Sequence, residues 1–597
     1  MNAIHVKFPS MILLLWFWPL LTAAATATLA ERVDDPLCGR IEQFSQSGPW
    51  VIQGAVVTSG PLLPELYRRN GLLPLWRQPL KIGEMMQLIA RSWDEGLIPE
   101  DYHQTILMHL LRRHRTEPMT HCERVDLDLL LSDALLRLGF HLRYGKVNPK
   151  SLDPNWNLQH LVEEDPLRSM QHAIEADSLN DYLRQFIPTQ LIYERLKQAL
   201  AQYRAIAAHG GWPEIPGGES IEPGDHDFRL ALIRGRLQLS GDLEEAPVAD
   251  PHQYDRQLVE AVRRFQRRHS LEADGVVGRK TRAAMNVPVS KRIAQIRVNL
   301  ERARWVFSQL PDDFVLVDIA GFKATLFRER APVWEAAVQV GTPLRETPIF
   351  RDLLEYLVFN PSWTVPPVIF KNDILPELRK NPDYLRERRM RIIDTLGGEV
   401  ESATIDWQRV GEHNFPYLIR QDPGPHNALG RIKFMFPNKH SVYLHDTPNK
   451  SGFRRQNRTF SSGCIRVDRP FELAELLLND PTKWSSEKIA QVIDTGETLH
   501  IPLKRRLPVL LLYWTVAADE SALFFRPDIY QRDVELLNAL NGDLESVLPF
   551  LPPNAVSHDG SPWFLTAPPG GILPGDRPNL PPAPTITTLA SDPTVTR

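Results

Sequence analysis

The segments Tyr443-Leu-His-Asp-Thr-Pro448 and Ser461-Ser-Gly-Cys-Ile-Arg-Val467 join a histidine to a lone cysteine in a glycine-serine turn. A cysteine nucleophile needs a base, because its ordinary pKa of about 8.5 leaves only about 3% thiolate at pH 7. It also needs backbone N–H groups directed at the developing oxyanion, which a Ser-Ser-Gly turn can supply. We therefore predict His445 as base and Cys464 as nucleophile, the alternatives being a satisfied core histidine and a small buried thiol.

Strand patterns flank both reactive residues. Residues 441–444 read as a strand that ends at the histidine, and the residues from Cys464 onward alternate in the same way. Because successive side chains of a strand point to opposite faces, Tyr443 should share a face with His445, and Arg466 with Cys464. Tyr443 and Arg466 are therefore candidates for the site.

The histidine, the loop and the Ser-x-Gly-Cys-x-Arg segment resemble the signature of L,D-transpeptidases with a YkuD-like catalytic domain. In that family the residue before the glycine is often histidine, whereas here it is Ser462, so no role of a second histidine is carried over. The resemblance implies that a backbone carbonyl holds the second ring nitrogen of His445. It also implies that Tyr443 and the backbone at Gly463 polarise the donor carbonyl, although Tyr443 could instead be a barrel-wall aromatic.

Arg466 has two expected roles, holding a carboxylate of the substrate or bracing the loop, and Ser462 belongs to the same substrate-facing turn.

By resemblance, the enzyme is a cysteine acyltransferase that needs no cofactor and forms 3→3 cross-links between peptidoglycan stem peptides through a thioester. It would also be a carbapenem target. The alternatives are an L,D-carboxypeptidase or lipoprotein-anchoring enzyme of the same fold and, from another class, a non-catalytic peptidoglycan-binding protein.

Other thiol enzymes fit the pattern less well. A sortase places its arginine many residues after the cysteine, whereas Arg466 follows Cys464 by two positions. A papain-like peptidase runs cysteine before histidine, the reverse of the order here. No His-x-x-x-His or Cys-x-x-Cys spacing predicts a metal site.

The sequence predicts an α+β multidomain chain, in line with its 597 residues. The expected fold combines a helical N-terminal scaffold, a three-helix peptidoglycan-binding domain and a β-rich, partly open barrel that carries a helical capping insertion. Pro-rich composition predicts a disordered tail. The expected boundaries are residues 35–220 for the scaffold, 222–290 for the peptidoglycan-binding domain, 305–530 for the catalytic domain, 368–418 for its insertion and 551–597 for the tail.

The N-terminus predicts export to the periplasm. Lys7 precedes an apolar run from Met11 to Ala25, so residues 1–27 have the form of a cleaved signal peptide or an inner-membrane anchor. In that oxidising compartment Cys38 and Cys122 could form one disulfide, or both could be unpaired thiols. The net charge of −4 indicates no nucleic-acid partner. Stem peptides and glycan are the expected partners, with other wall-synthesis enzymes as further candidates.

Overall fold

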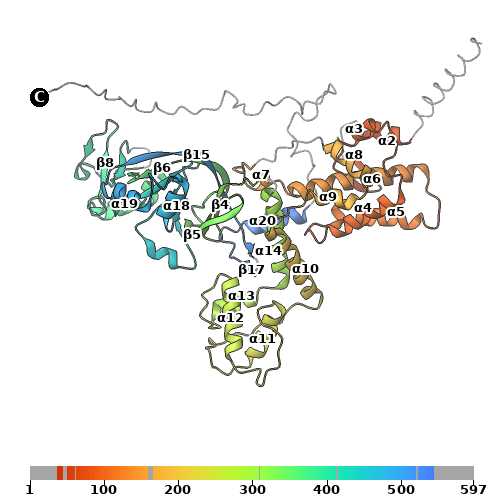
Figure 1. Ribbon diagram of the computed structural model, residues 1–597, viewed down its shortest axis with the longest axis horizontal. Coiled ribbons are helices and arrows are strands. Elements are labelled where there is room, and N and C mark those ends of the chain that lie inside the picture. Colours follow the sequence, from red (N-terminus) through yellow and green to blue (C-terminus); the bar gives the residue numbers. More distant parts are fainter. Residues whose placement is uncertain are drawn as a thin grey trace, which may run out of the picture.

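The computed structural model divides into three connected parts (Figure 1): helices α2 to α6, α8 and α9 at one end, a β barrel at the other, and a three-helix unit below them. The expected α+β architecture is confirmed, while the predicted signal segment and Pro-rich tail lie outside the described residues. None of the helices within those residues is long and apolar enough to cross a membrane. The described residues are 36–44, 50–60, 62–158, 166–307, 310–411, 415–519 and 522–542.

The N-terminal part packs around α6 (His121–Tyr144), whose buried residues occupy all sides of the helix. Thr120 and Glu123 form a reciprocal capping box that satisfies backbone N–H groups at its start. Cys122 in its first turn is a free, exposed thiol, so it is not in a disulfide; the Cys38 side chain lies outside the described set. The surrounding elements are α2 (Pro36–Phe44), β1 (Trp50–Ile52), β2 (Ala55–Val57), α3 (Leu62–Arg69), α4 (Pro79–Arg91), α5 (Gln104–Arg113), α8 (Pro166–Glu175) and α9 (Leu179–Arg184). The short helix α7 (Pro149–Leu152) instead packs Leu152 against the core that contains the barrel.

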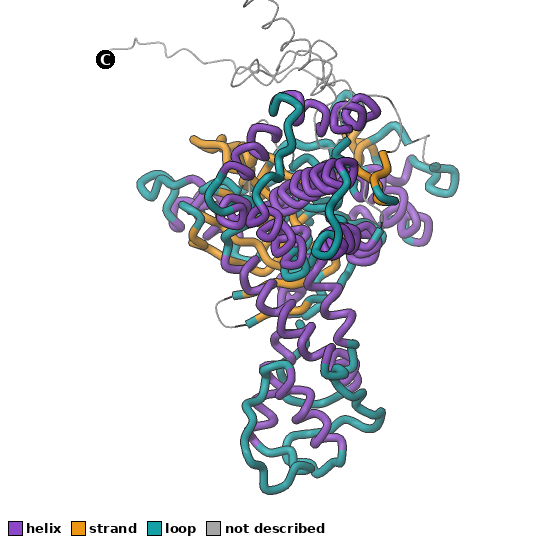
Figure 2. The backbone as a smooth tube through the Cα atoms, turned by 90° about the vertical axis from the view of Figure 1, so that its right-hand side faces the viewer, coloured by secondary structure: helices purple, strands orange, loops and turns teal. Residues whose placement is uncertain are grey.

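The three-helix unit projects away from the other two parts (Figure 2) and has a hydrophobic core of its own. It consists of α11 (Arg229–Leu239), α12 (Arg256–Arg268) and α13 (Arg279–Met285). Leu258, Val262 and Phe265 of the middle helix are all buried in that core.

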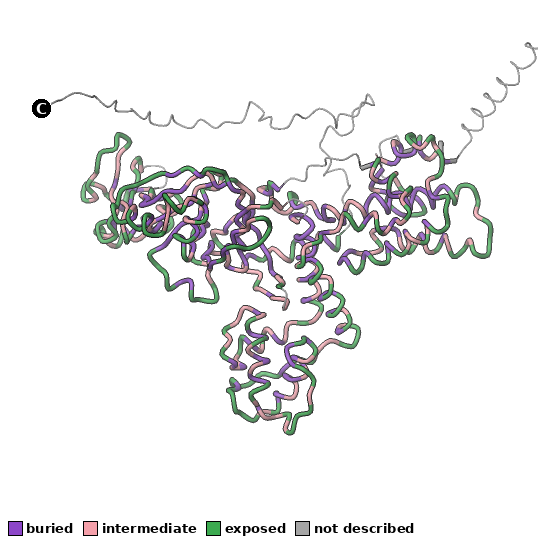
Figure 3. Tube along the Cα trace, in the orientation of Figure 1, coloured by how far each residue is buried: buried purple, intermediate pink, exposed green. Residues whose placement is uncertain are grey.

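Helices α10 (Leu191–Ala208) and α14 (Val289–Phe307) pack together where the three parts meet. Buried residues concentrate along these helices and in the barrel (Figure 3). Arg304 of α14 pairs with Glu301 at 2.8 Å and donates to the Tyr193 hydroxyl of α10 at 3.1 Å. The bond to Tyr193 connects α14 with α10, and Glu301 supplies the buried guanidinium with a counter-charge.

The strands of the C-terminal part form a closed ring, in contrast to the partly open barrel that was expected. The pairing order is β4, β5, β14, β12, β11, β6, β15, β3 and back to β4, with β13 added beside β5. Closure depends on the long strand β5, which pairs with both β4 and β14. The strands are β3 (Phe314–Asp318), β4 (Lys323–Arg328), β5 (Ala331–Gly341), β6 (Phe350–Phe359), β11 (Ile432–Met435), β12 (Leu444–His445), β13 (Thr459–Ser461), β14 (Ile465–Val467) and β15 (Leu499–Leu512).

Three helices cover the ring: α18 (Pro470–Leu478), α19 (Ser486–Asp494) and α20 (Arg532–Asn541). A short hairpin of β16 (Val516–Ala518) and β17 (Leu523–Phe525) follows β15. Helix α20 packs on α14, and the Lys146 side chain donates to the Leu540 carbonyl at 2.9 Å. The last described helix therefore ties the barrel to the N-terminal helices.

The insertion is a mixed α/β subdomain rather than a purely helical one. Its helical segments are α15 (Pro367–Ile369), α16 (Leu375–Lys380) and α17 (Tyr384–Glu387). Its four-stranded sheet runs in the order β7 (Trp363–Thr364), β10 (Leu418–Gln421), β8 (Met390–Ile393) and β9 (Glu399–Val400). The charged composition concealed these strands, because their few apolar residues face a separate small core around Leu378, Ile392 and Ile419.

Candidate active site

Hydrogen bonds on both sides hold the turn that presents Cys464. The Ser461 hydroxyl donates to the Cys464 carbonyl at 2.5 Å and accepts from the Gly463 N–H at 3.2 Å. The Thr347 hydroxyl donates to the Gly463 carbonyl at 2.8 Å. Gly463 has φ of +111°, a conformation that side-chain-bearing residues rarely adopt. The turn therefore needs glycine immediately before the cysteine.

His445 is buried at the end of β12, with one ring nitrogen committed to a backbone carbonyl. Its Nδ1 lies 2.5 Å from the Asp446 carbonyl oxygen, which can only accept, so Nδ1 carries the proton and Nε2 keeps a lone pair. Burial, aided by the positive charge of Arg466, lowers the pKa of His445 to about 3. The imidazole is therefore neutral at neutral pH and can accept a proton at Nε2.

The parallel pairing of β12 with β14 brings together the two segments that carry the predicted site residues, with Tyr443 directly before β12 and Cys464 directly before β14. The register sets Leu444 against Ile465 and His445 against Arg466, and the Ile465 N–H donates to the Tyr443 carbonyl at 3.0 Å. Leu444 and Ile465 point into the barrel core. Strand alternation therefore places Tyr443, His445, Cys464 and Arg466 together on the opposite face.

Burial raises the pKa of the Cys464 thiol, although hydrogen bonds from the Tyr443 backbone and hydroxyl and the charges of Lys433 and Arg466 act in the opposite direction. The thiol also faces the Ser441 carbonyl at 3.7 Å. The thiol and the imidazole are consequently both neutral at neutral pH. The Gly463 N–H, which was expected to serve the oxyanion, already donates to Ser461. The Cys464 N–H has no acceptor among the described residues.

The remaining two predicted residues have contacts within the protein. Arg466 donates from Nη1 to Gln339 Oε1 at 3.2 Å, a bracing contact with β5. The Ser462 hydroxyl is exposed and lies 2.9 Å from Nη1 of Arg345.

Lys433 is a site residue that sequence reasoning missed. It lies on β11 directly opposite His445, and its ammonium is 3.9 Å from the centre of the Tyr443 ring. A lysine within the otherwise apolar strand segment 432–435 is unusual and could have drawn attention to Lys433. The sequence pattern does not reveal which strand pairs with this segment, so it could not place Lys433 beside His445.

A second missed group is the loop between β5 and β6, which supports the cysteine turn. The Tyr530 hydroxyl donates to the Gly341 carbonyl at 2.7 Å and accepts from the Thr347 N–H at 3.2 Å. Arg532 pairs with Glu346 at 2.7 Å and with Asp153 at 3.0 Å. Residues from the N-terminal part and from the chain after β17 thus support the loop that holds Gly463.

The insertion reaches the same turn through Arg345. The Arg345 guanidinium donates to both carboxylate oxygens of Asp373, at 2.5 and 2.7 Å, as well as to Ser462. Asp373 belongs to the π-helical turn Phe370–Ile374 of the insertion. One arginine therefore connects the insertion to the residue two positions before the nucleophile.

Two further features lie elsewhere. His226, Asp250 and His252 of the three-helix unit could together ligate a metal ion, a grouping that no local spacing predicted; two of the three are exposed.

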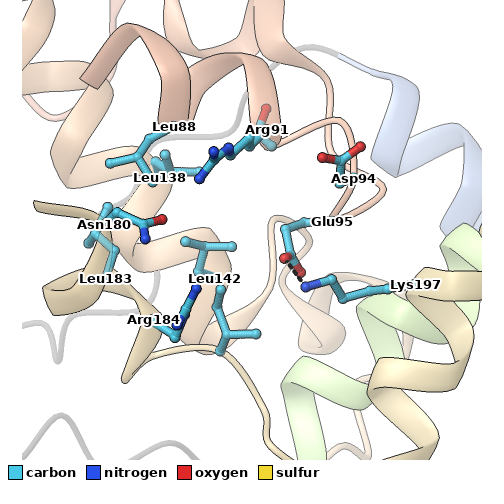
Figure 4. A pocket seen from close by; sticks show the side chains of 12 residues that line it. Leu88, Arg91, Asp94, Glu95, Leu138, Leu142, Asn180, Leu183, Arg184 and Lys197 are labelled. Atoms are coloured by element: carbon cyan, nitrogen blue, oxygen red, sulfur yellow. Dashed lines mark ion pairs between the residues drawn. The ribbon is translucent and has the colours of Figure 1, made fainter. Parts of the chain in front are cut away.

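A cavity of about 200 Å³ between α4, α6 and α9 (Figure 4) has leucine walls and charged residues, including the ion pair of Glu95 with Lys197. Its lining residues all lie between Leu88 and Lys197, so it is separate from the Cys464 site.

Three domain families match this chain. Residues 61–200 match the "Scaffold domain", residues 231–285 match the "Putative peptidoglycan binding domain", and residues 312–496 match the "L,D-transpeptidase catalytic domain". The last match contains His445, Cys464, the loop between β5 and β6 that supports the cysteine turn, and the insertion.

A Haemophilus influenzae protein named "Putative L,D-transpeptidase" is 35% identical over 266 residues, which is 44% of this chain and 53% of that protein. The chain thus spans about half the length of this curated relative.

Solved L,D-transpeptidases from Stackebrandtia nassauensis and Mycobacterium smegmatis are each 12% identical to this chain. The match to the Stackebrandtia structure covers 50% of this chain and 96% of that one. The match to the Mycobacterium structure covers 34% of this chain and 58% of that one. Their TM-scores of 0.19 and 0.17 are too low to support an inference. This chain carries an L,D-transpeptidase catalytic domain together with a scaffold domain and a peptidoglycan-binding domain.

Proposed function

We propose that the protein is a periplasmic peptidoglycan L,D-transpeptidase that forms 3→3 cross-links. The observation that carries this proposal is the neutral His445, with Nδ1 tied to the Asp446 carbonyl, on the same strand face as Cys464. That arrangement supplies a base and a nucleophile without a metal or cofactor.

In the acylation step, the Cys464 sulfur attacks the carbonyl of the third residue of a tetrapeptide stem. The thiol proton passes to Nε2 of His445, the C–S bond forms, and the C–N bond to the terminal D-alanine breaks as the proton moves to the leaving amine. Because both groups are neutral at rest, proton transfer accompanies attack. The Tyr443 hydroxyl and the Cys464 N–H are the donors available to the oxyanion.

In the second step, the side-chain amine of the third residue of another stem attacks the thioester. Its proton passes through His445 to the departing sulfur, which restores the thiol and leaves a 3→3 link. Water as acceptor would make the same site an L,D-carboxypeptidase, and a protein lysine would make it a lipoprotein-anchoring enzyme. The insertion, connected to the cysteine turn by Arg345, favours the amine because a cover over the site excludes water.

The three-helix unit is proposed to bind glycan or stem peptide, in keeping with its match to a peptidoglycan-binding family. Export, with or without an N-terminal anchor, would place the chain beside this substrate.

The test is intact-mass measurement after incubation with tetrapeptide muropeptides, followed by product analysis. An acyl adduct on Cys464 and dimers with 3→3 links are expected, and a carbapenem should form a one-to-one adduct on the same residue. Tripeptide products without dimers would favour the hydrolase, and the absence of any adduct would refute the proposal.

A further inference from the structure

Two positive charges flank His445 on the outer face of the barrel. Antiparallel pairing places Lys433 of β11 beside the histidine on one side, and parallel pairing places Arg466 of β14 on the other. In the part of the chain that the structure describes, neither cation has a carboxylate partner. This row of side chains therefore carries a net positive charge beside the nucleophile.

The two cations differ in how they are held. Arg466 donates to Gln339, and the amide nitrogen of Gln339 donates in turn to the Asn449 carbonyl at 3.4 Å. Gln339 is fully buried, so Arg466 is braced by an immobile partner. Lys433 has no hydrogen-bond acceptor among the described residues and rests on the face of the Tyr443 ring.

A half-buried ammonium without an anion is costly, because it loses hydration that a cation–π contact only partly replaces. Consistent with this, burial lowers the pKa of Lys433. An arriving carboxylate would remove the penalty. Lys433 is therefore the group beside the nucleophile that gains most from an anionic ligand.

The position of Lys433 suits the acyl donor. The Tyr443 hydroxyl lowers the pKa of the Cys464 thiol and so belongs to its surroundings, and the Lys433 ammonium lies over that same ring. A peptide whose carbonyl is attacked by Cys464 must consequently pass close to Lys433. Stem peptides carry free carboxylates close to the bond that is cleaved.

We propose that Lys433 binds a free carboxylate of the donor stem peptide and so selects anionic donors, while Arg466 remains braced by Gln339. This inference rests on the proposed function, because it assigns the donor to that site. It names a specificity-determining residue and the chemical class that it recognises, a peptide carboxylate.

The experiment compares Lys433→Met, Lys433→Arg and wild type in the full-length chain, with Lys439→Met, an exposed lysine on the β11–β12 connection, as matched control. Two synthetic tetrapeptides are used, one with free carboxylates and one with every carboxylate amidated. Acylation of Cys464 is followed by intact mass at increasing donor concentration, and alkylation by iodoacetamide reports the reactivity of the thiol itself.

Lys433→Met should raise the half-saturating concentration of the acidic donor by about 10-fold or more, the value of a charge-assisted hydrogen bond. The half-saturating concentration of the amidated donor should change less than about threefold, Lys433→Arg should recover most of the affinity, and Lys439→Met should resemble wild type. Because the Lys433 charge also lowers the pKa of Cys464, alkylation by iodoacetamide should slow in Lys433→Met, and its rate corrects both donors for the change in thiol reactivity. Equal losses of affinity for both donors would overturn the proposal.

Calorimetric binding of both peptides to Cys464→Ala tests the inference without any chemistry. The acidic peptide should bind more tightly, and adding Lys433→Met should remove that preference. If the preference persists, the assignment of Lys433 is wrong even where acylation occurs. If acylation fails in wild type while the preference depends on Lys433, the proposed function fails and the anion site stands.

Discussion

The junction with the N-terminal helices and the outer face of the barrel use buried cations in opposite ways. Arg304 at the junction pairs with Glu301, and Arg137 of α6 pairs with Asp133 at 2.6 Å, all four side chains being almost fully buried. Lys433 and Arg466 at the barrel surface face no carboxylate in the described structure. The arginines at the junction have counter-charges within the protein, whereas the charge of Lys433 has none and is the basis of the proposed carboxylate site.

The largest expected effect separates chemistry from stability. Cys464→Ala should abolish acyl-enzyme formation, a loss of at least about 10⁴-fold, because the nucleophile is removed. Its melting temperature should remain close to wild type, since the turn is held through backbone atoms and Ser461. Intact mass and thermal unfolding measure the two properties.

The matched control for that experiment is Cys122→Ser, which alters an exposed free thiol in α6. Its activity should equal that of wild type. Residual cross-linking by Cys464→Ala would contradict the assignment of the nucleophile.

Removing one cation from each region tests the comparison directly. Arg304→Met should lower the free energy of unfolding by about 3–5 kcal/mol, because Glu301 is left as a buried unpaired charge. Lys433→Met leaves no orphaned carboxylate, so its unfolding free energy should stay within about 1 kcal/mol of wild type or rise. Chemical denaturation measures both.

Arg304→Met combined with Glu301→Gln should recover part of the lost stability, which identifies the orphaned charge as the cause. If Lys433→Met lowered the free energy of unfolding as much as Arg304→Met, the two cations would not differ in their contribution to stability, which would contradict the comparison.

The pH dependence of thiol reactivity sharpens the description of the barrel surface. Burial raises the pKa of Cys464, so its alkylation rate should keep rising above pH 9, by roughly tenfold per unit below the pKa. The pKa of His445, about 3, predicts no step in this profile between pH 5 and 8. Iodoacetamide kinetics in a Cys38→Ser, Cys122→Ser background provide the measurement. A plateau near pH 7 would instead indicate a resting thiolate–imidazolium pair.

The smallest effect concerns the link between the insertion and the cysteine turn. Asp373→Asn removes the ion pair with Arg345 but keeps the side-chain volume. Because this pair is partly exposed, cross-linking should fall by about two- to fivefold, with little change in iodoacetamide reactivity. Lys380→Gln, which removes an exposed pair within the insertion, is the control. Unchanged cross-linking in Asp373→Asn would exclude coupling through this contact.

The sequence by itself determined the fold class, the separate helical and β-rich regions, and the motif that carries His445 and Cys464. It could do so because the polar–apolar alternation of a strand, the one-sided apolar pattern of a helix and a short reactive motif are local properties of the chain. Three features depend instead on strand register and on contacts between residues up to 189 positions apart: the position of Lys433 beside His445, the closure of the barrel by β5, and the support of the turn by Thr347 and Tyr530. Only the tertiary structure decides these, since one residue of register shift moves a side chain to the opposite face of its strand.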